Sequence, residues 1–227
     1  DRTGTVPKAD YEFMGLKCSI GEVANRIQAS ELQDKGVLAN CHVNVLQTQD
    51  HPQFKTYAEE LKWLTTDSKR MSWVAQTISD IATSGNTLIL VDRISAGEIL
   101  EKKIKDSVFI RGATKNMERK EHYDEVSTAQ TKVIIATYGV AAVGINIPRI
   151  FNLVLIEPGK SFVRVIQSIG RGIRKAEDKD SVNIWDITSA CKFARRHLTQ
   201  RKKFYKEANY PYNIEKIDTD LYENFNT

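Results

Sequence analysis

The sequence predicts an α/β fold in which a parallel sheet is covered by helices on both faces. Short apolar runs alternate with segments of helical period along most of the chain. These runs are nearly continuous, which is typical of strands buried on both faces. The composition, 41% hydrophobic and 27% charged, is that of an ordinary soluble protein, and no apolar run approaches the ~20 residues of a membrane helix.

The first expected elements lie before residue 87. Residues 42–49 (HVNVLQTQ) alternate as a strand does, and 57–64 have the spacing of a short helix. Residues 68–83 carry apolar side chains at helical intervals up to the stop at Gly85, which predicts an amphipathic helix. One or two helical turns are also expected at 30–36.

From residue 87 onward strands and helices alternate. The expected strands are 87–92 (TLILVD), 108–112 (VFIRG), 132–138 (KVIIATY), 151–157 (FNLVLIE) and 182–187 (VNIWDI). The expected helices are 96–104, 116–127, 162–174 and 189–208. Residues 209–227 are polar, so we expect a loosely docked tail. In such a sheet, ligands bind at the carboxyl ends of the strands.

Positive charge is concentrated towards one end of the chain. The net charge is +4, but residues 160–207 hold 13 Lys/Arg against 5 Asp/Glu, which leaves −4 for the remainder. Within this region, residues 192–206 carry seven basic and no acidic residues, interleaved with Phe193, Phe204 and Tyr205. Such a stretch is typical of a polyanion contact. The alternative is a solvated helix face whose aromatic residues dock on the domain.

Cysteine and histidine spacing indicates neither disulfides nor a structural metal. Cys18, Cys41 and Cys191 are far apart, and no CxxC or HxxxH spacing joins them to the four histidines. Since the chain does not begin like a signal peptide, we expect an intracellular protein with reduced thiols.

Three short motifs resemble known sites but fail on context. The run at 159–161 (GKS) lacks the earlier glycine of a P-loop, because Val154 stands in its place. The acidic pair at 124–125 falls inside an expected helix, which indicates surface and not a magnesium site. The run at 170–172 (GRG) lacks the third glycine of a dinucleotide fingerprint.

Two segments carry more information. Residues 163–175 (VRVIQSIGRGIRK) have a stripe at Val163, Ile166, Ile169 and Ile173, yet hold two glycines that each cost roughly 1 kcal/mol in a helix. Arg171 and Arg174 are three residues apart, so both project from one side of the helix. In one interpretation the helix frays after Ile169 and the two arginines lie in solvent. In the other, their guanidinium groups point towards a transferring phosphate. In the segment ending at Pro148 (IIATYGVAAVGINIP), a buried strand leads into a loop of small residues. Small residues let the backbone come close to a phosphate or ribose. The alternative is that they only allow tight packing between the loop and the next helix.

In combination and order, these motifs resemble the second RecA-like domain of superfamily 2 helicases. The matching segments are TLILVD, FIRGAT, 117–119 (MER), IIATYGVAAVGINIP and QSIGRGIRK. Within the superfamily the sequence is similar to UvsW-type recombination and repair helicases of T-even-like phages, and Trp185-Asp186 also fits. The resemblance implies a RecA-like parallel sheet with a C-terminal basic helix. It places the end of the first domain and a linker at 1–40, the second domain at 41–188, and the basic helix and tail at 189–227.

The resemblance also implies roles for individual residues. Gln167, Gly170, Arg171 and Arg174 match the arginine motif that reaches the ATP phosphates across an interdomain cleft. Gly144 and Asn146 match the preceding nucleotide-binding motif, where Asp is commoner than Asn. Residues matching positions that hold the nucleic-acid backbone are Arg93, Gly112 and Thr137, and Arg111 stands where many relatives carry His. Further DNA contacts are expected from Arg195, Arg196 and Lys202 in the basic helix.

The expected activity is that of an ATP-dependent DNA helicase acting on forked or recombination DNA in the cytoplasm of an infected host. Residues 3–5 (TGT) resemble the motif that closes the first RecA-like domain, so the P-loop and magnesium ligands are expected upstream of Asp1. The chain alone, a fragment or one region of a longer protein, should therefore not turn over ATP with Mg²⁺. The alternatives are a non-catalytic nucleic-acid-binding module, a restriction-type translocase and an RNA helicase.

Overall fold

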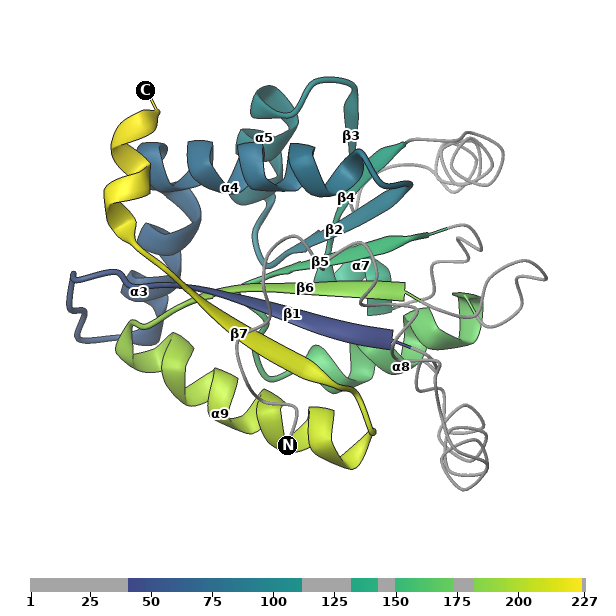
Figure 1. The fold of residues 1–227 in the computed structure, drawn as a ribbon. Coiled ribbons are helices and arrows are strands. Elements are labelled where there is room, and N and C mark those ends of the chain that lie inside the picture. Colours follow the sequence, from purple (N-terminus) through teal and green to yellow (C-terminus); the bar gives the residue numbers. More distant parts are fainter. Residues whose placement is uncertain (1–40, 112–131, 143–149, 174–181, 226–227) are drawn as a thin grey trace.

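The computed structural model describes residues 41–111, 132–142, 150–173 and 182–225. Its sheet has seven strands in the order β3-β4-β2-β5-β6-β1-β7, and every pair is parallel (Figure 1). The strands are β1 (Cys41–Thr48), β2 (Thr87–Val91), β3 (Ser107–Ile110), β4 (Val133–Thr137), β5 (Asn152–Ile156), β6 (Val182–Ser189) and β7 (Tyr212–Ile217). The predicted α/β class with a parallel sheet is confirmed.

Helices cover both faces of this sheet. Figure 1 shows α4 and α5 on one face and α8 and α9 on the other. The helices are α3 (Tyr57–Thr66), α4 (Ser68–Ala82), α5 (Ile94–Lys103), α7 (Tyr138–Ala142), α8 (Phe162–Ile173), α9 (Lys192–Glu207) and the 3₁₀ helix η2 (Thr219–Asn224). The expected helices at 30–36 and 116–127 lie outside the described residues. None of the described helices combines the length and the apolar character that a membrane crossing requires.

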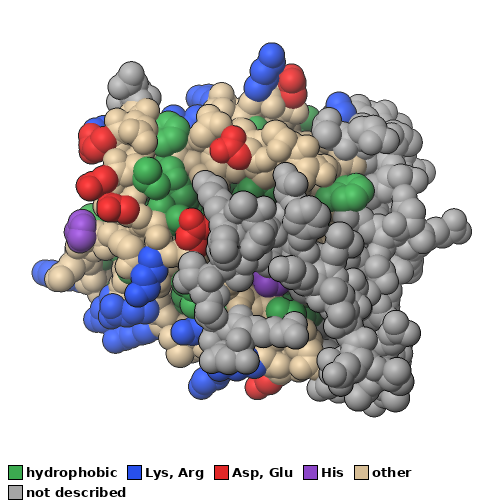
Figure 2. Space-filling model, viewed as in Figure 1, with side chains coloured by type: hydrophobic (Ala, Val, Ile, Leu, Met, Phe, Trp, Pro, Cys, Tyr) green, Lys and Arg blue, Asp and Glu red, His purple; other side chains and the backbone are tan. Residues whose placement is uncertain are grey.

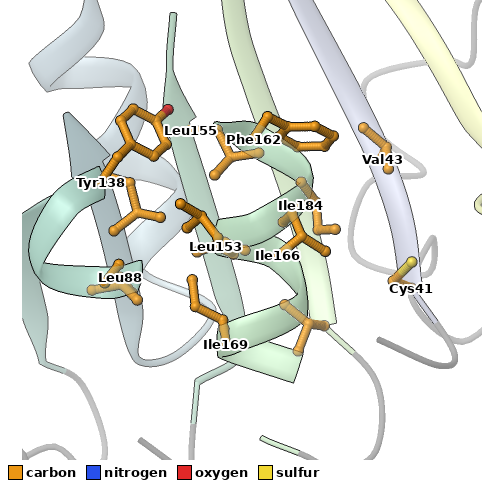
Figure 3. Close-up of a cluster of buried hydrophobic side chains, with 14 of the residues drawn as sticks. Cys41, Val43, Leu88, Tyr138, Leu153, Leu155, Phe162, Ile166, Ile169 and Ile184 are labelled. Carbon is orange, nitrogen blue, oxygen red and sulfur yellow. The ribbon is translucent and has the colours of Figure 1, made fainter. Parts of the chain in front are cut away.

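The core is divided by the sheet into two layers, because alternate residues of each strand point to opposite faces. Leu88 and Leu90 pack with α8, whereas Ile89 and Val91 pack with α4 and α5. Figure 3 shows the α8 layer, in which apolar side chains of the helix meet those of the strands. The buried stripe of α8 is Phe162, Val165, Ile166 and Ile169. The predicted stripe is confirmed at Ile166 and Ile169, and Val163 is partly buried and packs against the same cluster. The side chain of Ile173 lies outside what the structure describes.

The polar segment after residue 208 is not a loosely docked tail, and that prediction is wrong. Its residues form β7, which pairs in parallel with β1 from Val43–Tyr212 to Thr48–Ile217, and then η2. Three tyrosines in this segment are almost fully buried, namely Tyr210, Tyr212 and Tyr222. Paired backbone and buried aromatic rings therefore anchor a stretch that its side-chain polarity alone marks as solvent-exposed.

Strand β1 also differs from the prediction in its surroundings. Its sequence alternates apolar and polar side chains, yet all eight residues are buried. The reason is that β1 lies between β6 and β7, with helices over both faces. His42 of this strand pairs inside the protein with Asn213, across a 2.7 Å Nε2–Oδ1 contact, whereas the buried Asn44 amide has no hydrogen-bond partner among the described residues. A polar residue in a strand is therefore compatible with full burial when a neighbouring strand supplies a partner.

Candidate nucleic-acid and nucleotide interface

Three strands end in a row of polar residues at the carboxyl edge of the sheet. The register pairs Val91 of β2 with Thr137 of β4, and Ile110 of β3 with Ala136 of β4. Arg111 follows β3 directly, and Arg93 follows β2 after Asp92, so the two arginines flank Thr137 at this edge. The structure thus brings together Arg93 and Thr137, two of the residues predicted to hold a nucleic-acid backbone. Arg111 extends the same row.

Both arginines of this row present their guanidinium groups to solvent. The Arg93 side chain is 38% exposed, with Nε 3.9 Å from a carboxylate oxygen of Asp92. Arg111 lies over the Phe109 ring, with Cζ 4.9 Å from the centroid, and 3.6 Å from Glu101. Ion pairs this long and this exposed hold a side chain only weakly, so both arginines can turn to a phosphate.

Thr137 has a structural role that is compatible with ligand binding. Its Oγ1 accepts a hydrogen bond from the backbone N–H of Val140 at 3.2 Å, which caps the short helix α7. The hydroxyl proton remains available, because accepting a bond leaves the O–H free to donate. Thr137 can therefore donate to a phosphate oxygen while it holds the start of α7 in place.

The arginine-motif helix α8 packs on α7. The hydroxyl of Ser168 lies 3.3 Å from the carbonyl oxygens of both Ala141 and Ala142, at the end of α7. Gln167, the neighbouring residue, is partly exposed. The helical backbone continues to Ile173 and does not stop at Ile169, so Gly170 and Arg171 lie in its last turn.

The remaining residues of the two nucleotide motifs are not covered by the structure. Side chains from residue 170 to 173 are not described. Arg174, Gly144, Asn146 and Gly112 lie outside the described residues, as do the acidic pair at 124–125 and the TGT motif at 3–5. Their roles therefore stay predictions.

Helix α9 has a basic outer face and a buried inner face. The exposed cations are Lys192, Arg195, Arg196, Lys203 and Lys206, and Lys202 is partly exposed. The inner face is a stripe at intervals of four, three and four residues, formed by Ala194, Leu198, Arg201 and Tyr205. Tyr205 is fully buried and Phe204 packs partly buried against it, so these two rings belong to the core and not to a ligand surface.

Arg201 is a buried structural residue. The sequence analysis counted it among the seven basic residues of 192–206 and did not distinguish it from the exposed ones. It is 3% exposed, and its Nε and Nη2 bind the two carboxylate oxygens of Asp186 at 2.8 and 2.9 Å. Burial lowers the pKa of Arg201, but the charge and hydrogen bond of Asp186, together with the charge of Glu157, raise this pKa above its usual value, so the guanidinium stays charged. Its place in the apolar stripe of α9 was the sequence signal, because a cation at such a position needs a buried partner.

A second buried cation, Arg70, joins α4 to the carboxyl edge. It is fully buried, and Nη2 donates to a carboxylate oxygen of Glu157 at 3.0 Å and to Thr48 at 3.2 Å. Nε lies 3.6 Å from Asp50. Burial raises the pKa of Glu157 to about 7, and this rise is opposed by Arg70 and Arg201. The network holds the ends of β1 and β5 together at this edge, and the sequence analysis missed it.

The described residues contain no set of three His, Cys, Asp or Glu side chains placed to hold a metal ion. Cys41 and Cys191 are free and buried. Burial raises the pKa of the Cys191 thiol to about 11, so it is protonated at neutral pH and poorly reactive.

Comparisons with known proteins agree with this geometry. Residues 69–176 match the family model of the helicase conserved C-terminal domain. UvsW, an ATP-dependent DNA helicase of Enterobacteria phage T4, is 26% identical over 228 residues, which cover 95% of this chain and 45% of UvsW. A helicase of Sulfolobus islandicus filamentous virus is 31% identical over 104 residues, which cover 44% of this chain and 18% of that protein. The chain thus spans less than half the length of these relatives.

Solved structures match in fold. The crystal structure of T4 UvsW superimposes with a TM-score of 0.69 at 23% identity, covering 78% of this chain and 42% of that one. The Escherichia coli DEAD-box protein SrmB gives 0.53 at 15% identity, covering 80% and 93%. The fold is therefore that of RecA-like helicase C-terminal domains, and residues 69–176 are similar in sequence to the helicase conserved C-terminal domain. In both sequence and fold, the chain is similar to T4 UvsW.

Proposed function

We propose that this chain is the C-terminal motor half of an ATP-dependent DNA helicase that unwinds or branch-migrates forked and recombination DNA. The observation that carries the proposal is the row of Arg111, Thr137 and Arg93 at one edge of the sheet, in a domain similar to that of UvsW. Guanidinium and hydroxyl groups in a row suit the evenly spaced phosphates of a strand. Backbone contacts carry no sequence information, which is what a motor needs.

The ATP side of the proposal rests on the motif carried by α8. Gln167, Gly170, Arg171 and Arg174 would reach the ATP phosphates on a partner RecA-like domain of the same protein, and Gly144 and Asn146 would lie near the nucleotide. Arginine supplied across such a cleft stabilises charge that develops on a transferring phosphate, by as much as 10³-fold or more in rate. By the same resemblance to superfamily 2 helicases, the magnesium ligands would lie in that partner domain.

Domain closure would couple the two sides. Ser168 joins α8 to α7, and the Thr137 hydroxyl caps α7, so the arginine helix and the row of Arg111, Thr137 and Arg93 belong to one packed unit. Movement of α8 towards a nucleotide would therefore carry the row with it. This mechanical link supports alternating grip and release of a DNA strand during ATP turnover.

The test is DNA-stimulated ATP hydrolysis by the full-length protein. Replacing Arg171 or Arg174 by Ala should reduce turnover by about 10³-fold while DNA affinity changes little. Arg164→Ala is the matched control, because Arg164 is an exposed arginine at the opposite end of α8. Unchanged turnover in the Arg171 and Arg174 variants would contradict the arginine assignment. Comparing branched DNA, linear duplex and RNA as activators separates the proposed helicase from a translocase of linear duplex and from an RNA helicase.

A further inference from the structure

Three aromatic rings meet at the carboxyl edge of the sheet, next to the ends of β5 and β6. Tyr57 begins α3, and Phe193 and His197 lie one turn apart on α9. The ring centroids of Tyr57 and His197 are 4.9 Å apart and edge-on, and those of Tyr57 and Phe193 are 6.3 Å apart. Tyr57 is 36% exposed, although it is a large ring in a well-packed domain. We call these three residues the aromatic patch.

Buried polar contacts hold the aromatic patch in place. The carboxylate of Glu60 on α3 accepts hydrogen bonds from the backbone N–H groups of Phe193 at 3.0 Å and Ala194 at 2.8 Å, which joins α3 to the start of α9. Arg201 donates from Nη1 to the carbonyl oxygen of Pro158 at 2.8 Å, which joins α9 to the connection between β5 and α8. A ligand that binds such a preorganised surface pays little ordering entropy.

The connection after β5 approaches the patch closely. A side-chain carbon at Gly159 would lie 3.2 Å from the Tyr57 hydroxyl, so glycine leaves room for this approach. Lys160, the next residue, is exposed. Burial, and then the charges of Arg201 and Lys160, lower the pKa of His197, so its ring is neutral at neutral pH. Burial and the charge of Asp92 raise the pKa of Tyr57, which therefore keeps its hydroxyl proton.

Cations surround these neutral rings. Lys192 Nζ lies 5.3 Å and Arg196 Cζ 5.8 Å from the centroid of the Phe193 ring. Figure 2 shows Lys and Arg side chains gathered over the first half of α9, at the lower left of the view. The surface thus offers uncharged aromatic rings for stacking and a positive field for phosphate, which is the chemistry of single-strand binding.

We propose that the aromatic patch binds a single DNA strand, with an unpaired base stacked on Tyr57 and the adjoining phosphates held by Lys160, Lys192 and Arg196. This inference rests on the proposed function in one respect, namely that DNA passes over the carboxyl edge. A base within a duplex shows no free face to a ring, so the patch selects the unpaired strand of a fork.

The position of the patch along the sheet supports this assignment. The row of Arg111, Thr137 and Arg93 ends β3, β4 and β2, and the patch borders the ends of β5 and β6, which come next in the sheet. Five adjacent strand ends at about 4.8 Å spacing span roughly 19 Å. A strand laid along this edge therefore meets the phosphate contacts first and the stacking surface next.

The experiment measures DNA affinity of the full chain without ATP, by fluorescence anisotropy. The probes are a short single-stranded DNA, an abasic strand of the same length and charge, and a duplex. Tyr57→Ala should weaken binding of the base-bearing strand by roughly 5- to 150-fold. It should leave the abasic strand and the duplex unchanged, because neither offers a base to the ring. Phe151→Ala is the control, since Phe151 is a similarly exposed ring that precedes β5 and thus lies at the opposite edge.

Several outcomes would overturn the proposal. Equal weakening of the base-bearing and abasic strands would mean that Tyr57 only supports the fold, and Tyr57→Leu, which keeps an apolar side chain on α3, checks this separately. An unchanged affinity would remove the patch from the DNA site. An acidic peptide with the same charge as the single-stranded DNA serves as a further probe. If Tyr57→Ala abolished binding of this peptide, the patch would be a binding site for a protein partner and not for DNA. Failure of the proposed function is distinguishable, because it shows in ATP turnover of the Arg171 variant and not in this affinity.

Discussion

Replacing Arg70 by Met tests whether buried ion pairs hold the carboxyl edge together. Methionine keeps the unbranched shape but removes the charge and the donors that reach Glu157 at 3.0 Å, Thr48 at 3.2 Å and the Leu64 carbonyl oxygen at 2.5 Å. All three hydrogen bonds are charge-assisted, because the guanidinium donates each of them. Removing Arg70 leaves the buried Glu157 carboxylate without its partner, and breaking a buried ion pair in this way costs roughly 3–5 kcal/mol.

The assay is urea unfolding followed by tryptophan fluorescence at pH 8. A loss of about 3–5 kcal/mol is a large part of the roughly 5–15 kcal/mol that stabilises a typical domain. Lys69→Met is the matched control, because Lys69 pairs with Glu223 at 2.9 Å but both side chains are exposed, so the loss should stay under about 1 kcal/mol. The reasoning fails if Arg70→Met costs no more than this control. A double variant with Glu157→Gln should recover part of the loss, since it leaves one fewer unpaired carboxylate.

Two further predictions concern pH and salt. The pKa of Glu157 in the folded protein is raised from 4.5 to about 7. Between these pH values the folded state therefore binds a proton that the unfolded state has lost. The free energy of unfolding should fall as pH rises from about 4.5 to about 7. Glu157→Gln should flatten this dependence in urea unfolding, whereas a variant with the same slope as the parent would disprove it; Glu223→Gln, at an exposed site, is the control. Arg93→Ala should weaken DNA binding and lower the slope of log affinity against log salt by about 1. An unaltered slope would take Arg93 out of the DNA site.

The basic helix illustrates how the structure changes the design of such tests. Deleting everything after Ser189 would remove β7 from the sheet and leave Asp186 buried without Arg201. Loss of DNA binding in that truncation would therefore report unfolding as much as lost contacts. Point substitutions at Arg195 and Arg196, which are exposed, leave the inner face of α9 intact and are the appropriate probes.

The sequence by itself determined the class of the fold and most of its elements. Apolar runs such as TLILVD became buried strands, and the helical spacing of 68–83 became α4, because both patterns are local and report one environment over many residues. The order of short motifs also placed Arg93 and Thr137 correctly at strand ends. Periodicity and motif order do not depend on residues that are distant in the sequence, so these features could be predicted from the sequence alone.

Only the tertiary structure decided which polar residues are internal. In the sequence, Arg70 and Arg201 look the same as the exposed arginines. Their buried partners, Glu157 and Asp186, are 87 and 15 residues away along the chain. The polar segment after residue 208 became a strand because β1 offered an unpaired edge to its backbone. Hydropathy scores side chains one at a time, whereas the free energy of burying a charge or a backbone amide depends on the partner that the fold brings to it.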